Sequence, residues 1–334
     1  MSCVQIDAGP CFAASEQESL LKAALRAGVG FPYECHSGGC GACKFDLLEG
    51  EVETLWPDAP GLSARERQRG KKLACQSLPR GDLRIKVRPS PEYIPFVNPR
   101  RFQAKFTAAR QLTHDMAEFS FKAEGAADFL PGQYSLLTLP ELGLQRAYSM
   151  SNLKNGEGHW KFIVRSVAGG VVSQYLFNKL SPGATVELDG PYGMAWMRPL
   201  DRDLICIAGG SGLAPMLSIA YAATPLLEES GRKLHFYFGA RTTKDLVAQR
   251  QLETLRSQSG RLECVEVVSQ PIEGDGWAGP TGFVHQEVKR TFGDTLPGHE
   301  VYFAGPPPMA QALLDLLMVE SGVPYSQIHF DRFF

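Results

Sequence analysis

The 334-residue sequence has no apolar run long enough to span a membrane, and its charges nearly cancel, to a formal net charge of -2. A membrane-spanning helix needs about 20 mostly apolar residues. Near-neutrality gives no electrostatic reason to expect nucleic acid or an anionic membrane as a partner. The segment Met1 to Phe12 contains Asp7 and lacks the basic stretch and long apolar run of a signal peptide. We therefore expect a cytoplasmic protein with no nucleic-acid partner and no membrane partner.

Internal repeats and low-complexity tracts are also absent, so the chain reads as an ordinary globular protein. Its length predicts two or three domains. Four prolines between Pro89 and Arg101 interrupt both helix and sheet hydrogen bonding and predict a linker. A weaker junction follows Gly190 to Gly193. These junctions predict three folded segments, 1–92, 101–198 and 199–334, with a linker over 93–100.

The three segments differ in the secondary structure that they predict. The first mixes short strands, including Glu49 to Glu53, with a helix over Glu16 to Ala27 that Gly28 ends. The middle segment consists mostly of strand-like runs separated by Gly and Pro, as in a small antiparallel barrel or sandwich. In the last segment apolar strands alternate with helical patterns, which predicts a parallel sheet with helical crossovers. The alternating pairs are Leu204–Ala208 with Leu213–Ala222, Leu234–Phe238 with Asp245–Arg256, and Val301–Ala304 with Met309–Leu317.

Four of the eight cysteines follow a metal-binding spacing. Four residues separate Cys35 from Cys40, two separate Cys40 from Cys43, and 31 precede Cys75. This is the C-x4-C-x2-C…C spacing of plant-type [2Fe–2S] clusters, in which each of two irons needs two thiolates. The small residues between the first three ligands let backbone N–H groups approach the sulfurs. We therefore predict that these four cysteines bind a [2Fe–2S] cluster.

A zinc site or unrelated buried thiols are the alternative readings of this pattern. Zinc ribbons prefer two C-x2-C-like pairs, whereas here the first gap is longer and the last cysteine has no close partner. The other four cysteines follow no such spacing and are expected to be ordinary thiols: Cys3, Cys11, Cys206 and Cys264.

Two short motifs in the middle segment offer groups that suit a flavin nucleotide. In Arg146-Ala147-Tyr148-Ser149, arginine suits a pyrophosphate, tyrosine offers a flat face to the flavin ring, and serine offers a hydroxyl to a ring nitrogen. Alone, this string is also compatible with an ordinary sheet edge. Gly170 and Ser173 lie at the start of a predicted helix, and a helix N-terminus is a phosphate site.

Two further motifs follow predicted strands in the last segment and point to a dinucleotide. Gly209, Gly210 and Gly212 lead into a helix that contains Pro215, and such glycines let backbone approach a pyrophosphate. The string differs from G-x-G-x-x-G because proline takes the last position. Gly305 and Pro306 follow a later strand, at the carboxyl edge where ligands bind in such sheets; a simple strand-to-helix turn is the alternative reading.

Together these residues resemble the ferredoxin–NAD(P)H reductase superfamily and, over the whole chain, the reductase components of bacterial aromatic-ring oxygenases. Three stretches look especially like the reductases of toluene-4-monooxygenase and its diiron monooxygenase relatives: Phe31 to Cys43, Leu47 to Pro57, and His329 to Phe334. The resemblance implies a multidomain fold. It consists of an α+β plant-type ferredoxin domain over 1–92, an antiparallel β-barrel FAD domain over 101–198, and an α/β parallel-sheet NAD-binding domain over 199–334.

The resemblance also implies FAD rather than FMN, with Val164 added to the flavin-binding residues. It implies that the terminal Phe334 covers the flavin face where nicotinamide arrives, so that Ser149 and Phe334 are the expected catalytic residues; core packing is the alternative role for Phe334. In the family a cysteine often precedes the Gly-Pro-Pro string, and here that residue is Ala304. Arg241 or the nearby Lys244 is a candidate for a 2′-phosphate, and Asp245 for ribose hydroxyls. The family resemblance favours NADH.

The expected function is electron transfer from NADH through FAD and the [2Fe–2S] cluster to a partner. The partner implied is a Rieske-type ferredoxin or the hydroxylase of a diiron toluene or aromatic monooxygenase, and we expect the reductase to be a monomer. Glu49, Glu51 and Glu53 are read as a solvated strand face, with an acidic docking stripe as the alternative. Two rival functions are the reductase of a Rieske aromatic dioxygenase and a redox sensor or carrier with low turnover, to which Ala304 points.

Overall fold

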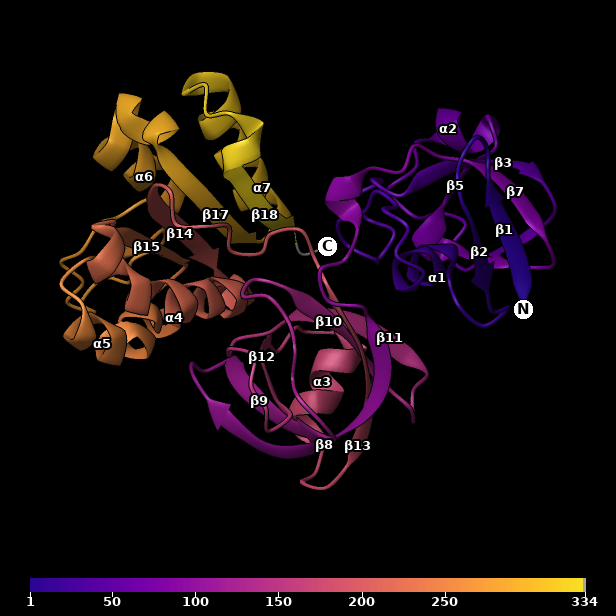
Figure 1. The fold of residues 1–334 in the computed structure, drawn as a ribbon. Coiled ribbons are helices and arrows are strands. Elements are labelled where there is room, and N and C mark those ends of the chain that lie inside the picture. Colours follow the sequence, from indigo (N-terminus) through magenta and orange to yellow (C-terminus); the bar gives the residue numbers. More distant parts are fainter. Residues whose placement is uncertain (333–334) are drawn as a thin grey trace. The chain divides into compact units, whose positions relative to one another are not determined.

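A computed structural model describes residues 1–332 (Figure 1). The described chain forms two compact units. Of the described residues, the N-terminal unit comprises 1–101 together with 189–194, and the C-terminal unit comprises 102–188 and 195–332. Among the described residues, no helix combines the length and apolar character that crossing a membrane requires. The predicted limits of the three segments and the linker remain predictions, because the two units divide the chain differently.

The N-terminal unit is built on a five-stranded mixed sheet in the order β2-β1-β7-β3-β5. Helix α1 (Leu20–Arg26) covers it and buries Leu20, Leu21 and Leu25. The helix is shorter than the predicted Glu16 to Ala27 because Ser19 takes the N-cap position in extended conformation. The remaining elements are β1 (Ser2–Ile6), β2 (Cys11–Ala14), β3 (Lys44–Glu49), β4 (Val52–Thr54), α2 (Ala64–Gln68), β5 (Lys71–Leu73), β6 (Ser77–Pro79) and β7 (Leu83–Lys86).

The single strand predicted over Glu49 to Glu53 is wrong. Gly50 adopts a φ of +90°, and a Cβ there would meet the Asp82 carbonyl oxygen at 2.4 Å, so a turn ends β3 at this point. Glu49 therefore lies on β3 and Glu53 on β4, where they pair with Arg84 and Arg80 respectively. The acidic docking stripe on one strand face consequently does not form.

A buried carboxylate ties the segment 189–194 to the rest of the N-terminal unit. Asp189 is fully buried, and its carboxylate lies 3.3 Å from Lys22 Nζ and 2.6 Å from Arg26 Nη2, both on α1. The Tyr192 hydroxyl donates to Asp189 at 2.8 Å, and Gly193 N donates to the Tyr33 hydroxyl at 3.0 Å. Burial alone would raise the pKa of Asp189, but the charges of Lys22 and Arg26 outweigh it and lower the pKa below its usual range.

The first half of the C-terminal unit is the predicted antiparallel barrel. Its six strands have the order β11-β10-β13-β8-β9-β12, and a bridge between Met150 and Phe162 brings the two edges together. Inward-facing aromatic residues such as Phe119, Phe121 and Trp160 fill its core. The elements are β8 (Arg100–Gln111), β9 (Met116–Ala123), β10 (Tyr134–Leu139), β11 (Leu144–Ser149), β12 (His159–Arg165), α3 (Val171–Asn178) and β13 (Thr185–Tyr192).

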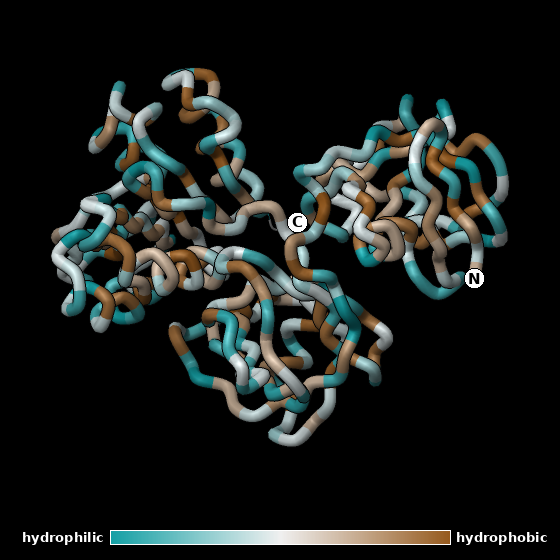
Figure 2. Tube along the Cα trace, viewed as in Figure 1, coloured by the Kyte–Doolittle hydropathy of each residue, from teal (hydrophilic) through white to brown (hydrophobic). Residues whose placement is uncertain are grey.

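The second half of this unit is a five-stranded parallel sheet in the order β16-β15-β14-β17-β18. Helices α4 and α5 cover one face and α6 and α7 the other, so that two apolar layers enclose the sheet (Figure 1). Hydrophilic residues occupy many of the outward turns (Figure 2). The elements are β14 (Asp203–Gly209), α4 (Leu213–Ser230), β15 (Leu234–Ala240), α5 (Ala248–Gln258), β16 (Leu262–Val268), α6 (Val284–Phe292), β17 (His299–Gly305), α7 (Pro307–Leu314) and β18 (Ile328–Arg332).

We predict that Asp189→Asn destabilises the N-terminal unit by about 3 kcal/mol, because it removes the buried carboxylate that both Lys22 and Arg26 face. In differential scanning calorimetry of the full chain, the unfolding transition of the N-terminal unit should move to lower temperature. The transition of the C-terminal unit should not change. The stabilisation is present above the unfolded-state pKa of about 3.9 and is lost as pH falls through the lowered native pKa. The loss of unfolding free energy in Asp189→Asn should therefore be constant from neutral pH to mildly acid pH. Asp128→Asn, at an exposed site, is the control, and an equal deficit there would contradict the prediction.

Candidate functional site

The structure brings the four predicted cluster ligands together in two pairs. Cys35 Sγ and Cys40 Sγ lie 3.2 Å apart, and Cys43 hydrogen-bonds to Cys75. Contact with the Cys40 thiol is the main reason that the pKa of Cys35 falls to about 5, against the opposing effect of burial. The thiolate is the form that binds metal. Two pairs of sulfurs, one pair for each iron, are the donor set that a [2Fe–2S] cluster requires.

The backbone around these sulfurs is shaped by close approach. Ser37 N and Cys40 N donate to Cys35 Sγ, and Ala42 N donates to Cys40 Sγ, each at 3.4 Å. Gly41 has a φ of +77°, and a Cβ on it would lie 2.5 Å from the Gly61 carbonyl oxygen. Side chains are thus excluded where N–H groups must face sulfur, and such hydrogen bonds tune a cluster's potential.

The predicted flavin residues lie on β11, β12 and α3 of the barrel. Arg146 and Tyr148 share one face of β11, and Ser149 is buried on the other. Burial raises the pKa of Tyr148 to about 12, so its phenol stays neutral and its ring offers a flat apolar surface. The Val164 side chain is buried in the barrel core, which leaves its backbone as the part that a ligand can reach.

Helix α3 lies beside β11 and offers a phosphate site at its N-terminus, with Gly170 at the N-cap. The Ser173 hydroxyl is already engaged, because it donates to Gly170 O at 3.0 Å and accepts from Val167 N at 3.1 Å. Its role here is therefore to hold the turn, and the backbone N–H groups are the donors left for an anion. A Cβ on Gly170 would meet Ser173 Oγ at 2.7 Å, which explains the glycine.

A pocket of about 750 Å³ opens at the carboxyl ends of β14, β15 and β17. Its walls come from both halves of the C-terminal unit: the barrel contributes Asp115, Met116 and the run from Arg165 to Ala168, and the half that contains the parallel sheet contributes the rest. Five of the residues predicted to bind the nicotinamide dinucleotide line it, and four do not. The lining residues are Gly209, Gly210, Arg241, Asp245 and Pro306, and those outside are Gly212, Pro215, Lys244 and Gly305.

The glycines of the two strand-end motifs serve packing as well as ligand approach. A Cβ on Gly212 would lie 2.0 Å from the Ala304 carbonyl oxygen, and one on Gly209 would lie 2.6 Å from Met309 Sδ. Gly209 and Gly210 both line the pocket, but Gly210 differs in having a φ of +56° and in leaving room for a Cβ, whose nearest contact would be Arg165 Nη1 at 3.4 Å. Close packing of the ends of β14 and β17 therefore accounts for Gly212, whereas the open pocket accounts for Gly210.

Sequence reasoning missed an ion-pair network at the mouth of this pocket. Arg165 Nε lies 2.6 Å from Asp115 Oδ2, and Arg165 Nη2 lies 3.0 Å from Asp245 Oδ1. Asp245 Oδ2 also accepts from Thr242 N and Thr242 Oγ1. Burial would raise the pKa of Asp245, but these hydrogen bonds and Arg165 lower it. Asp245, predicted as a ribose ligand, is thus engaged within the protein, and no sequence motif marked Arg165.

Two residues, Phe334 and Ala304, were expected to lie near the nicotinamide. Phe334, expected to cover the flavin, lies outside the described residues. Ala304 is fully buried on β17, and its carbonyl oxygen packs against Gly212. A methyl group at this position supplies no thiol, so any hydrogen bond that a cysteine gives in relatives is replaced here by apolar packing.

Three family models match consecutive parts of the chain. They describe a 2Fe-2S iron-sulfur cluster binding domain over residues 6–80, an oxidoreductase FAD-binding domain over 103–196 and an oxidoreductase NAD-binding domain over 206–315. The ferredoxin–NAD(P)(+) reductase CarAd of Metapseudomonas resinovorans is 45% identical over 95% of both chains. The ferredoxin–NAD(+) reductase component of an alkene monooxygenase system from Xanthobacter autotrophicus is 37% identical over 99% of this chain and all of that one.

The chain belongs to the ferredoxin–NAD(P)(+) reductases. Solved structures agree: the ferredoxin reductase in carbazole 1,9a-dioxygenase superposes with a TM-score of 0.91 at 40% identity, over 100% of this chain and 98% of that chain. The Amycolatopsis cytochrome P450 reductase GcoB gives 0.84 at 28% identity, over 100% and 99%. The three-part fold and the FAD, NAD and [2Fe–2S] cofactors are therefore confirmed, and the protein is a flavin and iron–sulfur oxidoreductase. The likeness to the toluene-4-monooxygenase reductase in particular remains a prediction.

We predict that Cys75→Ser abolishes the [2Fe–2S] absorption of this reductase, because one iron would lose one of its two thiolate ligands. FAD content and NADH-driven ferricyanide reduction should persist, since the barrel and the parallel sheet form a separate unit. Iron analysis and the visible spectrum measure the outcome. Cys11→Ser, at an exposed thiol, should retain the full iron content; a Cys75→Ser protein with a normal spectrum would remove Cys75 from the ligand set.

Proposed function

We propose that this reductase oxidises NADH and delivers electrons singly to the ferredoxin or hydroxylase of a multicomponent oxygenase. The observation that carries the proposal is the composition of the pocket wall. Barrel residues and residues at the carboxyl ends of the parallel strands line one space, so a nicotinamide held there faces the flavin barrel. When bound, FAD would supply the two-electron hydride chemistry and the [2Fe–2S] cluster the one-electron chemistry that this function requires.

The chain's own residues would place the reactants, since hydride transfer requires no protein acid or base. Tyr148 supports the flavin ring, Arg146 and the α3 N-terminus hold its phosphates, and Ser149 faces the ring edge. Gly210 lets the dinucleotide backbone approach, and the Arg165 network closes the barrel side of the pocket. Cys35, Cys40, Cys43 and Cys75 hold the cluster from which electrons leave.

The partner is inferred from motifs and from the names of relatives. Relatives along nearly the whole chain serve both oxygenase types by name: one is the electron transfer component of xylene/toluene monooxygenase of Pseudomonas putida, and another is the reductase of a carbazole dioxygenase. We propose a Rieske-type ferredoxin or hydroxylase of a diiron aromatic monooxygenase, and a cytoplasmic monomer as the working form. A Rieske dioxygenase system is the second candidate. Cytochrome c reduction with purified partners of each type separates the two.

We predict that two equivalents of NADH, added anaerobically, bleach both the flavin and the iron–sulfur absorption, and do so faster than NADPH. Stopped-flow spectroscopy at flavin and cluster wavelengths gives both rates. Equal rates would overturn the preference for NADH and leave the reductase function intact. A coloured protein that neither coenzyme reduces would instead favour a sensor or carrier.

We predict that Ser149→Ala slows flavin reduction by NADH roughly 10- to 100-fold, which corresponds to the loss of one hydrogen bond to a polarised group worth about 1.5–3 kcal/mol. FAD content should be unchanged, because the phosphate-binding groups are intact. Single-turnover kinetics isolate this step from later electron transfer. Ser120→Ala, on β9, is the control. Normal flavin reduction in Ser149→Ala would refute the role of this hydroxyl.

A further inference from the structure

Two histidines and an aspartate gather at the edge of the parallel sheet opposite the nicotinamide pocket. Asp203 and His299 are the first residues of β14 and β17, and His235 is the second residue of β15. The pocket lies at the other, carboxyl ends of the same strands. The trio is therefore separate from every residue assigned to the reductase function.

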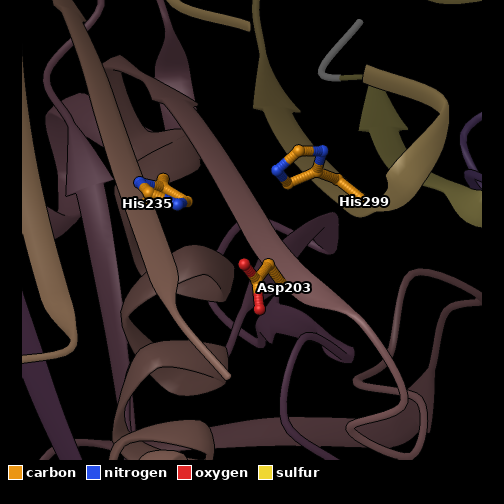
Figure 3. A group of neighbouring side chains, drawn as sticks. All are labelled: Asp203, His235 and His299. Atoms are coloured by element: carbon orange, nitrogen blue, oxygen red, sulfur yellow. The ribbon is translucent and has the colours of Figure 1, made fainter. Parts of the chain in front are cut away.

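Strand register places all three side chains on one face of the sheet. In the parallel pairing, Asp203 lies opposite His299, and Ile205 lies opposite His235. Asp203 and Ile205 are two residues apart on β14, so they project to the same face. Figure 3 shows the three side chains around a common space, with the aspartate on the middle strand. A ligand atom from each lies within 4.8 Å of the other two.

Hydrogen bonds fix the tautomer of both imidazoles. His235 Nδ1 lies 3.1 Å from the Glu263 carboxylate, and His299 Nδ1 lies 2.9 Å from the Thr295 carbonyl oxygen. Both partners accept hydrogen bonds, so each Nδ1 carries the proton and each Nε2 keeps its lone pair. An outer carboxylate or carbonyl on the non-ligating nitrogen is the usual arrangement around metal-binding histidines.

Neighbouring side chains and backbone hold the two rings and the aspartate in place. The Phe292 ring packs edge-on against both imidazoles, with centroids 5.1 Å from His235 and 4.8 Å from His299. Lys233 N donates to Asp203 Oδ1 at 3.1 Å. Among the described hydrogen bonds, none joins one of the three side chains to another.

We propose that Asp203, His235 and His299 bind a divalent transition-metal ion, Zn²⁺ foremost, through one carboxylate oxygen and two Nε2 atoms. Bonds of about 2.0 Å in tetrahedral geometry place ligand atoms about 3.3 Å apart, so small side-chain rotations from the present separation suffice. Three protein ligands leave one coordination position for water or an outside ligand. The site would crosslink β14, β15 and β17 at their amino ends.

The test is equilibrium dialysis of the intact holoenzyme against Zn²⁺, followed by elemental analysis of zinc and iron in one sample. Iron reports whether the [2Fe–2S] cluster has survived. We expect the wild-type protein to bind one more equivalent of zinc than the double variant His235→Ala/His299→Ala, at equal iron content. Comparing variants cancels zinc bound by the exposed thiols Cys3 and Cys11.

The matched control is His159→Ala, since His159 is an exposed histidine on the barrel strand β12. It should bind as much zinc as the wild type. Glu263→Ala keeps all three ligands and removes only the hydrogen bond to His235, so its zinc affinity should fall about 10-fold. The proposal is overturned if the double variant binds as much zinc as the wild type, or if His159→Ala loses as much as the double variant. Unchanged affinity in Glu263→Ala overturns the assignment of His235 as a ligand.

Discussion

The geometry of the reductase site depends above all on Arg165, at the end of β12. Its guanidinium joins Asp115 in the barrel to Asp245 beyond β15, and so sets the barrel wall against the carboxyl edge of the parallel sheet. Asp245 is buried and Arg165 is largely covered, so this contact is screened less than a surface pair. Other polar contacts reinforce the same junction, including Ser218 Oγ to Asn152 O and Arg110 to Gln251. The pocket exists because these links hold its two walls together.

Local sequence spacing predicted the parts of the site that lie on one loop or one strand end. Cys35, Cys40 and Cys43 are fixed by their spacing, and the glycine string before α4 is recognisable because a strand precedes it and a helix follows. Arg165 could not be found in this way, because its partners lie 50 and 80 residues away in the sequence. Pairings of that kind come from tertiary structure, and no local periodicity records them.

The element types were mostly predictable, whereas element limits and residue roles were less so. The alternation of apolar and helical runs predicted the parallel sheet, but Gly50 turned a predicted strand into two, because its positive φ is invisible in a polarity pattern. Ser173 lies in the first turn of α3 and Gly212 lies directly before α4, where their motifs predict a helix to begin. The Ser173 hydroxyl is nevertheless used in a turn, and Gly212 is used in packing between strand ends. A sequence motif therefore predicts the region where a ligand binds, but not which atoms contact the ligand.

The burial of Asp189 among Lys22, Arg26 and Tyr192 has a consequence for biosynthesis. The N-terminal unit draws its last piece, residues 189–194, from a stretch that is translated long after residue 101. A nascent chain that has exposed only the first hundred residues carries Lys22 and Arg26 on α1 before the buried carboxylate of Asp189 has been synthesised. Domains generally fold in order as they leave the ribosome. Here the contacts between α1 and residues 189–194 can form only after most of the barrel has been synthesised.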